Sequence, residues 1–172
     1  MKYLSLFFVL LLISCGTTVG IDYDKNTDFS QYNSYNYFPT IDSGLNDLED
    51  KRIIRVMDSL LQQRGFVQSE TPQLLINFFA KEQVSNSRNT VGIGIGGGGG
   101  NVGVGVSGGI PIGGREINQV LTVDFIDATD DKLVWQAEAD GSFKERATPQ
   151  QKEAYYVSVL QKILKKYPPE NK

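Results

Sequence analysis

The sequence INQVLTVDFID, at residues 117–127, alternates apolar and polar side chains in its second half. Because successive side chains of a β-strand point to opposite faces, this alternation predicts a strand with one buried face. The side chains expected on the buried face are Leu121, Val123 and Phe125. The turn-forming stretch DATDDK follows at residues 127–132, and LVWQAEA at residues 133–139 is again typical of a strand. The two stretches together predict a β-hairpin.

Four further elements flank this hairpin. They are a strand at residues 34–38, a helix at residues 48–64, a strand at residues 74–81 and a helix from Thr148 to about Tyr167. In the first helix Ile53, Met57 and Leu61 recur at helical spacing, and in the second Thr148 and Gln151 fit a capping box. Strands in the middle with helices toward both ends predict an α+β fold. We expect an antiparallel sheet with two helices on one face, a two-layer sandwich, in a single domain over residues 28–172.

The composition limits the binding partners and the catalytic chemistry that can be expected of the chain. The chain has 172 residues, a net charge of -3, no histidine and one cysteine. A weakly acidic domain lacks the positive charge that neutralises phosphates, so nucleic acid is not an expected partner. A single cysteine can form neither an intramolecular disulfide nor a thiolate cluster, and the usual imidazole base is missing. No cofactor and no metal are expected.

The N-terminus has the pattern of an export signal. Lys2 precedes a run of about ten apolar residues, which is too short to span a bilayer. The run ends at Leu12-Ile13-Ser14-Cys15, which resembles the bacterial lipobox. This resemblance implies that residues 1–14 are removed and that Cys15 carries lipid. The alternative is an ordinary secretory signal, which would leave an unpaired cysteine in an oxidising compartment.

Residues 15–27 are polar and aperiodic, and we interpret them as the lipidated N-terminus and a tether. Because Gly16-Thr17-Thr18-Val19 contains no acidic run, the expected location is the periplasmic side of an outer membrane.

Several stretches of the mature chain also carry a family resemblance. They are DFSQYNSY at residues 28–35, LLQQRGF at 60–66, VDFID at 123–127, LVW at 133–135 and the helix end at Tyr167-Pro168. In this order they resemble the envelope lipoproteins grouped as domain of unknown function 4136, over about residues 22–168. The family comes with no established activity and no agreed functional residues. The resemblance therefore implies fold and compartment only.

A glycine-rich tract spans residues 90–114. Valine or isoleucine alternates with glycine at residues 91–95 and 102–106, which predicts two strands of a hairpin. The candidate partner surface is its tip, formed by Gly96, Gly97, Gly98, Gly99, Gly100 and Asn101. Four interpretations remain open: a plain hairpin arm, a flat face for stacking or self-association, insertion into lipid, and a phosphate loop. A phosphate loop needs a helix after the glycines, and the pattern here predicts another strand.

Few other residues of the sequence suggest a catalytic, metal or ligand site. Asp130 and Asp131 fit a turn, and the aspartates near them lack the spacing of a calcium loop. Asp124 and Asp127 should lie on opposite faces of one strand, which argues against a shared acid–base site with Glu138. We expect Trp135 to be a core or interface aromatic. The tyrosines of the first strand region should pack on the sheet; they are Tyr23, Tyr32, Tyr35 and Tyr37.

These patterns favour a non-catalytic envelope lipoprotein with a binding or scaffolding role. Its expected partners are a membrane, through lipid on Cys15, and an envelope protein or a second copy of the chain. The alternatives are a carboxylate-dependent hydrolase and an oligomeric or membrane-interacting protein that acts through the glycine-rich arm.

Overall fold

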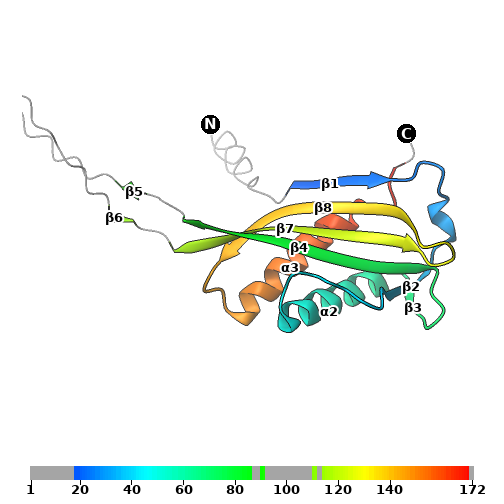
Figure 1. Cartoon of the computed structure of the whole chain (residues 1–172), viewed down its shortest axis with the longest axis horizontal. Helices are drawn as coiled ribbons and strands as arrows, with labels where there is room; N and C mark the ends of the chain where they lie inside the picture. Colours follow the sequence, from blue (N-terminus) through cyan, green and yellow to red (C-terminus); the bar gives the residue numbers. More distant parts are fainter. Residues whose placement is uncertain (1–17, 87–89, 92–109, 112–113, 171–172) are drawn as a thin grey trace, which may run out of the picture.

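The computed structural model describes residues 18–86, 90–91, 110–111 and 114–170. Six strands form one mixed sheet in the order β1-β8-β7-β4-β2-β3, and α2 and α3 cover one face of it (Figure 1). The bounds are β1 Thr18–Tyr23, β2 Ser34–Tyr37, α2 Asp47–Gln63, β3 Val67–Gln68, β4 Leu74–Asn86, β7 Arg115–Asp127, β8 Lys132–Lys144 and α3 Pro149–Leu164. A short 3₁₀ helix, Phe29–Gln31, precedes β2. The α+β fold with both helices on one face is the predicted one.

The three long strands β4, β7 and β8 form the middle of the sheet. β7 pairs antiparallel with β4 along its whole length and with β8 on its other side, so the predicted hairpin is confirmed. Leu121, Val123 and Phe125 are fully buried on the face that the helices cover. β4 runs to Asn86 and is therefore longer than the strand expected at residues 74–81.

The sheet is mixed, whereas the sequence analysis expects an antiparallel one. β2 is parallel to both β3 and β4. The reason is topological: α2 connects β2 to β3 and carries the chain back to the end of the sheet at which β2 began, and such a crossover joins parallel strands.

The sheet also begins earlier than the sequence analysis expects. Residues 15–27 were expected to be a tether, but Thr18–Tyr23 forms β1 and pairs antiparallel with β8, from Thr18 opposite Asp140 to Tyr23 opposite Trp135. Val19 and Tyr23 pack against the core. The short alternation of Val19, Ile21 and Tyr23 with Gly20 and Asp22 is enough for an edge strand, because β8 supplies the hydrogen-bonding partners.

Local signals at the helix ends explain why both helices form where predicted. The Asn46 side chain accepts hydrogen bonds from the backbone N–H groups of Leu48 and Glu49, and Gly65 takes a positive φ of 86° just after α2. The capping box predicted at Thr148 and Gln151 is present at the start of α3.

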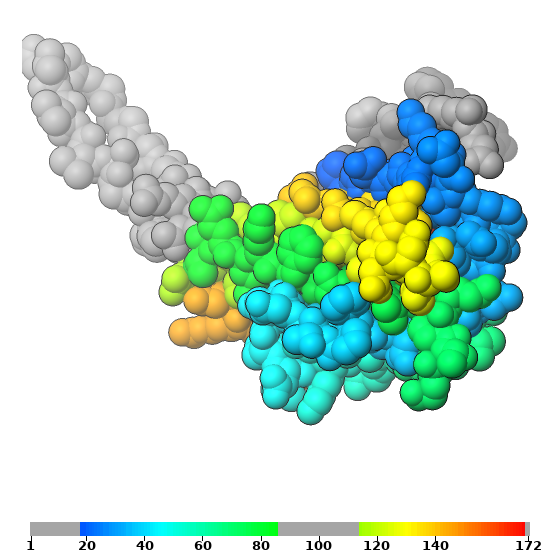
Figure 2. Space-filling model, turned by 45° about the vertical axis from the view of Figure 1, so that its right-hand side comes forward, coloured from blue at the N-terminus to red at the C-terminus, as the bar shows by residue number. Residues whose placement is uncertain are grey.

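An aromatic cluster fills the core near the turn that joins β7 to β8. The ring of Tyr167 lies 4.8 Å from that of Phe125 and 5.3 Å from that of Trp135. Trp135 is fully buried, so it is the core aromatic that the sequence predicts. The space-filling view shows the turn between β7 and β8 (yellow) beside the segment near the start of the described chain (blue) (Figure 2). Lys132 of β8 and Asp24 form an ion pair between these two segments.

The glycine-rich tract starts as a continuation of the β4–β7 hairpin. The two-residue strands β5 (Thr90–Val91) and β6 (Ile110–Pro111) pair antiparallel, and three residues separate this ladder from the β4–β7 ladder on each strand, so the register is kept. The predicted tip at residues 96–101 lies outside the described residues, as do residues 1–14 and Cys15. In the part of the chain that the structure describes, no helix is long and apolar enough to span a bilayer.

Candidate functional site

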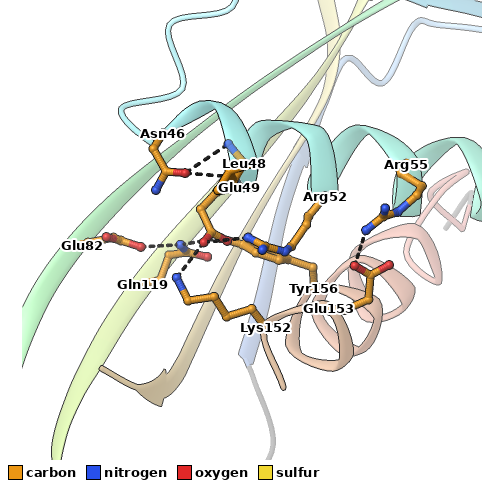
Figure 3. A network of polar contacts seen from close by, with 10 residues as sticks. All are labelled: Asn46, Leu48, Glu49, Arg52, Arg55, Glu82, Gln119, Lys152, Glu153 and Tyr156. Atoms are coloured by element: carbon orange, nitrogen blue, oxygen red, sulfur yellow. Dashed lines mark hydrogen bonds and ion pairs between the residues drawn. The ribbon is translucent and has the colours of Figure 1, made fainter. Parts of the chain in front are cut away.

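A buried carboxylate marks the place where the two helices meet the sheet (Figure 3). Glu49, in the first turn of α2, is only 4% exposed. Its Oε1 accepts a hydrogen bond from Arg52 Nη1 at 2.9 Å and another from Lys152 Nζ of α3 at 2.6 Å. A carboxylate near a helix N-terminus is favoured by the helix dipole, but burial is costly unless cations compensate the charge. Arg52 and Lys152 supply that compensation.

The sheet joins this cluster through Gln119 of β7, which is 1% exposed. Its Nε2 donates to Glu82 Oε1 at 2.8 Å and lies 3.2 Å from the hydroxyl oxygen of Tyr156. Burial is the main cause that raises the pKa of Tyr156, so this hydroxyl stays protonated. β4, β7 and α3 are thus tied together beside the Glu49 ion pairs.

Two acceptor atoms in the cluster, Glu49 Oε2 and Gln119 Oε1, are buried with no hydrogen-bond partner among the described residues. Both cations contact the other oxygen of Glu49, an arrangement that compensates a buried charge and joins α2 to α3. Arg55 of α2 and Glu153 of α3 form a second, more exposed ion pair between the same helices. We therefore interpret the cluster as a structural connection between the helices.

A groove of about 840 Å³ lies on the other side of α3, between this helix and the end of β8. Its floor is Gly141, on which the ring of Tyr155 rests so closely that a Cβ at Gly141 would lie 2.7 Å from the tyrosine hydroxyl oxygen. Phe143 forms a wall, with its ring 4.8 Å from that of Tyr155 and 5.5 Å from Lys152 Nζ. Thr18, the first residue of β1, lines the rim.

The hydroxyl of Tyr155 is buried and has no hydrogen-bond partner among the described residues. Burial raises its pKa, so the group remains a donor at neutral pH. An unpaired buried hydroxyl costs roughly 1–3 kcal/mol. The groove therefore contains a buried hydroxyl donor that an acceptor atom of a ligand or partner could bind.

The structure keeps the predicted carboxylates apart. Asp124 lies on the sheet face away from the helices and accepts hydrogen bonds from Gln136 at 2.8 Å and Asn77 at 3.2 Å. Asp127 accepts one from the Tyr32 hydroxyl at 2.6 Å, and this bond holds the pKa of Asp127 below its usual value. The register shift of this hairpin comes from an extra residue in β8, so β7 keeps the alternation that separates the two aspartates.

The other carboxylates are exposed and distributed along the hairpin. Glu138 is exposed, opposite Thr122. Asp130 and Asp131 lie in the predicted turn, where Asp131 takes a positive φ of 55°. No group of three or more carboxylate or cysteine side chains with the geometry of a metal site occurs in the described ranges.

The tyrosines of the first strand region have structural partners. Tyr35 and Tyr37 of β2 donate to the same Asp58 oxygen on α2, at 2.9 and 2.7 Å. Tyr23 and Tyr32 pack edge-on against Phe29. They support the fold, as predicted, and Asp58 of α2 is the acceptor that two of them share.

A family model described as "Domain of unknown function (DUF4136)" matches residues 19–169. The chain belongs to this family. Among solved structures, this DUF4136 chain is similar to a PDZ domain protein from Parabacteroides distasonis, with a TM-score of 0.54 and 16% identity over 99% of the chain. The chain spans 41% of the length of that protein, and a likeness at this identity concerns the fold alone.

A second similar structure is the PelC dodecamer from Paraburkholderia phytofirmans, with a TM-score of 0.44 and 15% identity, covering 86% of this chain and 94% of that one. No curated protein matches the DUF4136 chain. The candidate site residues from the sequence, Cys15 and the glycine-rich tip formed by Gly96, Gly97, Gly98, Gly99, Gly100 and Asn101, lie outside the described residues. The Glu49 cluster and the Tyr155 groove had no sequence motif to indicate them.

Proposed function

We propose that this DUF4136 protein is a lipoprotein of the bacterial cell envelope, anchored through lipid on Cys15, whose α+β domain has a non-catalytic binding or scaffolding role. The observation that carries the proposal is the start of β1 at Thr18, only three residues after Cys15. An apolar segment that ends in Leu12-Ile13-Ser14-Cys15 is thus followed almost at once by the folded domain. The boundary between export signal and domain falls at the one cysteine of the chain.

The physics of anchoring fits this arrangement. Each buried methylene of an acyl chain contributes about 0.8 kcal/mol, and stable membrane attachment takes two or more chains. The two or three chains that a lipidated N-terminal cysteine carries are sufficient. Since three residues span roughly 10 Å at most, the domain would be held close to the bilayer.

The binding or scaffolding role is supported by how the polar groups are arranged. The most deeply buried carboxylate, Glu49, is engaged by Arg52 and Lys152, and Asp124 is engaged by two amide side chains. The groove at Tyr155 lies beside Thr18, at the side of the domain from which the anchor would leave. Its lining combines the rings of Phe143 and Tyr155 with polar side chains such as Lys162, and a ligand or partner could contact both kinds.

The test is acylation in cells. The native protein should incorporate labelled palmitate and release an N-terminal peptide that starts at an acylated Cys15. Cys15→Ser should lose the label and leave an uncut precursor, while Thr17→Ser, a matched change two residues away, should keep both. A native chain that starts before residue 15 and carries no acyl mass would contradict the proposal. In fractionated cells we expect the native protein in the outer membrane, protected from added protease.

A second candidate function is self-association or membrane contact through the glycine-rich tract. The pairing of β5 with β6 in the register of β4 and β7 favours it, because it makes the tract an extension of the central hairpin. Replacing residues 96–101 with Asn-Gly should leave the melting temperature nearly unchanged, since no core strand depends on the tip. Loss of crosslinks to envelope partners in this variant would support the tract as the working surface, and their retention would argue against it.

A further inference from the structure

Three lysines lie at the end of α3, on the side of the domain where β1 is the edge strand of the sheet. Lys162 is in the last turn of the helix, Lys165 is its C-cap and Lys166 follows directly. Lys165 and Lys166 are exposed, and Lys162 is partly exposed. Among the residues that the structure describes, none of the three forms an ion pair, whereas Lys152 and Glu153 at the other end of α3 are both paired with α2. The charges of the three lysines are therefore free to attract an anionic partner.

Two grooves connect these lysines with β1. The groove of about 840 Å³ described above is lined by both Lys162 and Thr18, the first residue of β1. A second groove, of about 380 Å³, is lined by Lys165, Lys166 and Ile21 of β1. Because both grooves lie between the same strand and the same helix, these residues belong to one side of the domain. We call it the basic side and define it by Thr18, Ile21, Lys162, Lys165 and Lys166.

The basic side is positive although the net charge of the chain is -3. Two carboxylates, Asp140 and Glu170, line the same grooves as the three lysines. Asp140 follows the fully buried Ala139 in β8, so its carboxylate projects to the sheet face away from α3. The C-terminus of a helix carries a partial charge of only about −0.5, which is too small to offset three lysines. The surface next to α3 therefore has the charge that an anionic partner requires.

The basic side also has an exposed apolar side chain. Ile21 is 38% exposed. It stands opposite the buried Ala137 of β8, and directly opposed residues of antiparallel strands project to the same face, so Ile21 projects toward the helix side. Binding to a membrane surface increases with the apolar area that enters the interface and with the attraction to anionic lipids. Ile21 and the neighbouring lysines supply both contributions.

The distance along the chain from Cys15 indicates which partner this surface meets. Thr18 follows Cys15 by three residue steps, which span roughly 10 Å at most in any conformation. Attraction between exposed charges extends over about one Debye length, which is roughly 8 Å at physiological ionic strength. With lipid on Cys15, the side of the domain that contains Thr18 is held within or close to this range of the headgroups. A lysine cluster elsewhere on the domain would have no such constraint.

We propose that the basic side is a membrane-docking surface, on which Lys162, Lys165 and Lys166 bind the headgroups of anionic phospholipids and Ile21 enters the interface. This inference rests on the proposed lipidation of Cys15 and adds to it an orientation: the domain lies on the bilayer with β1 and the end of α3 against it. A lysine near an anionic membrane surface raises the binding equilibrium by about fivefold. Three lysines together therefore contribute roughly a hundredfold.

The test is photocrosslinking in the full-length lipidated protein, purified from cells and reconstituted into vesicles. One set of vesicles is phosphatidylcholine alone, and the other is phosphatidylcholine mixed with phosphatidylglycerol; both contain a trace of radiolabelled phosphatidylcholine. A photoreactive amino acid replaces Ser158, an exposed residue one helical turn before Lys162. The matched control replaces Ser59, an exposed serine of α2. The yield of protein joined to labelled lipid is measured, and mass spectrometry of the same samples reports the acyl chains on Cys15.

In the anionic vesicles we expect a high yield at position 158 and a low yield at position 59. The yield at position 158 should fall in neutral vesicles and at high salt, because both remove the attraction to the lysines. Combining Lys165→Gln with Lys166→Gln should lower the docking equilibrium by roughly thirtyfold. The matched control combines Lys51→Gln with Lys81→Gln, which removes the same charge from exposed lysines of α2 and β4 and should leave the yield at position 158 unchanged.

Acylated protein with equal yields at positions 158 and 59 would overturn the docking surface and leave the lipoprotein proposal intact. The same holds for a yield at position 158 that neither the lipid charge nor the Lys165 and Lys166 variant changes. Crosslinks from position 158 to a second copy of the chain in place of lipid would also overturn it. Protein that carries no acyl chain on Cys15 would overturn both proposals.

Discussion

Gly141 offers a direct test of how the groove is built. A Cβ at this position would lie 2.7 Å from the Tyr155 hydroxyl oxygen and 2.9 Å from its Cε2. Carbon contacts are most favourable at about 3.5–4.0 Å, so in Gly141→Ala the ring must withdraw and disturb its packing against Phe143 and Tyr156. Such overpacking costs about 1–3 kcal/mol.

An opposing effect sets the size of the net change. Alanine is favoured over glycine inside a strand by about 0.5–1 kcal/mol, because glycine loses more conformational entropy on folding. The net loss expected for Gly141→Ala is therefore about 1 kcal/mol. In a Tyr155→Leu background the atoms that the Cβ would meet are gone, and the same substitution should become neutral or stabilising. Gly20→Ala in β1 is the matched control, since a Cβ there meets nothing within 4 Å.

The assay is urea unfolding followed by the fluorescence of Trp135. The chain has one tryptophan, and it is fully buried, so the signal reports on the core alone. The four proteins of the cycle give the coupling energy between Gly141 and Tyr155, which we expect to be about 2 kcal/mol. Equal effects of Gly141→Ala in both backgrounds would show that Tyr155 does not rest on Gly141, and the description of the groove would be wrong.

Three further predictions concern the rest of the domain, each measured by the same unfolding assay. Glu49→Gln should destabilise the fold by about 2–3 kcal/mol, because two partly buried cations lose their counter-ion, whereas Glu153→Gln at the exposed ion pair should cost less than about 1 kcal/mol. Leu160→Ala should cost about 2–5 kcal/mol, since Leu160 is fully buried beneath the sheet; a negligible cost would mean that α3 does not pack there. Tyr32→Phe should destabilise at neutral pH and matter less in acid: the depressed pKa of Asp127 makes the bond stabilising above about pH 4, and this contribution is lost as the pH falls further. A Tyr32→Phe effect that stays constant down to acidic pH would argue against this bond.

The elements with strong local signals were predictable from the sequence. The strand at residues 117–127 alternates strictly over residues 121–125, and α3 has a capping box at Thr148, so each needs information from only a few neighbouring residues. β1 has only six residues with a glycine among them, and its strand character depends on β8, more than a hundred residues further along the chain. This dependence on a distant partner is why the sequence suggested a tether there.

The site residues were missed for the same physical reason. Glu49 looks like a solvated charge at a helix N-terminus, and its burial follows from Lys152, which lies far along the chain and meets it only because α2 and α3 pack together. Gly141, in the stretch Asp140-Gly141-Ser142, has the composition of a turn. The structure shows it inside β8, where the missing side chain makes room for Tyr155.

The position of Thr18 has a consequence for the glycine-rich tract. Across the sheet, Thr18 of β1 lies opposite Asp140 of β8, which lies opposite Val120 of β7, which in turn lies opposite Lys81 of β4. From Lys81, β4 runs a further five residues to Asn86. Five strand residues extend roughly 17 Å, and the three residue steps from Cys15 to Thr18 span roughly 10 Å at most. β1 runs away from the end of the sheet where β4 stops, so Thr18 is the residue of β1 nearest to that end. An anchor at Cys15 would therefore hold Asn86, four residues before the glycine-rich tract begins at residue 90, within roughly 35 Å of the same membrane in any orientation. On this geometry, membrane contact and partner binding by the tract are competing uses of one position, and the variant with residues 96–101 replaced separates them: membrane contact predicts lost lipid crosslinks, and partner binding predicts lost protein crosslinks.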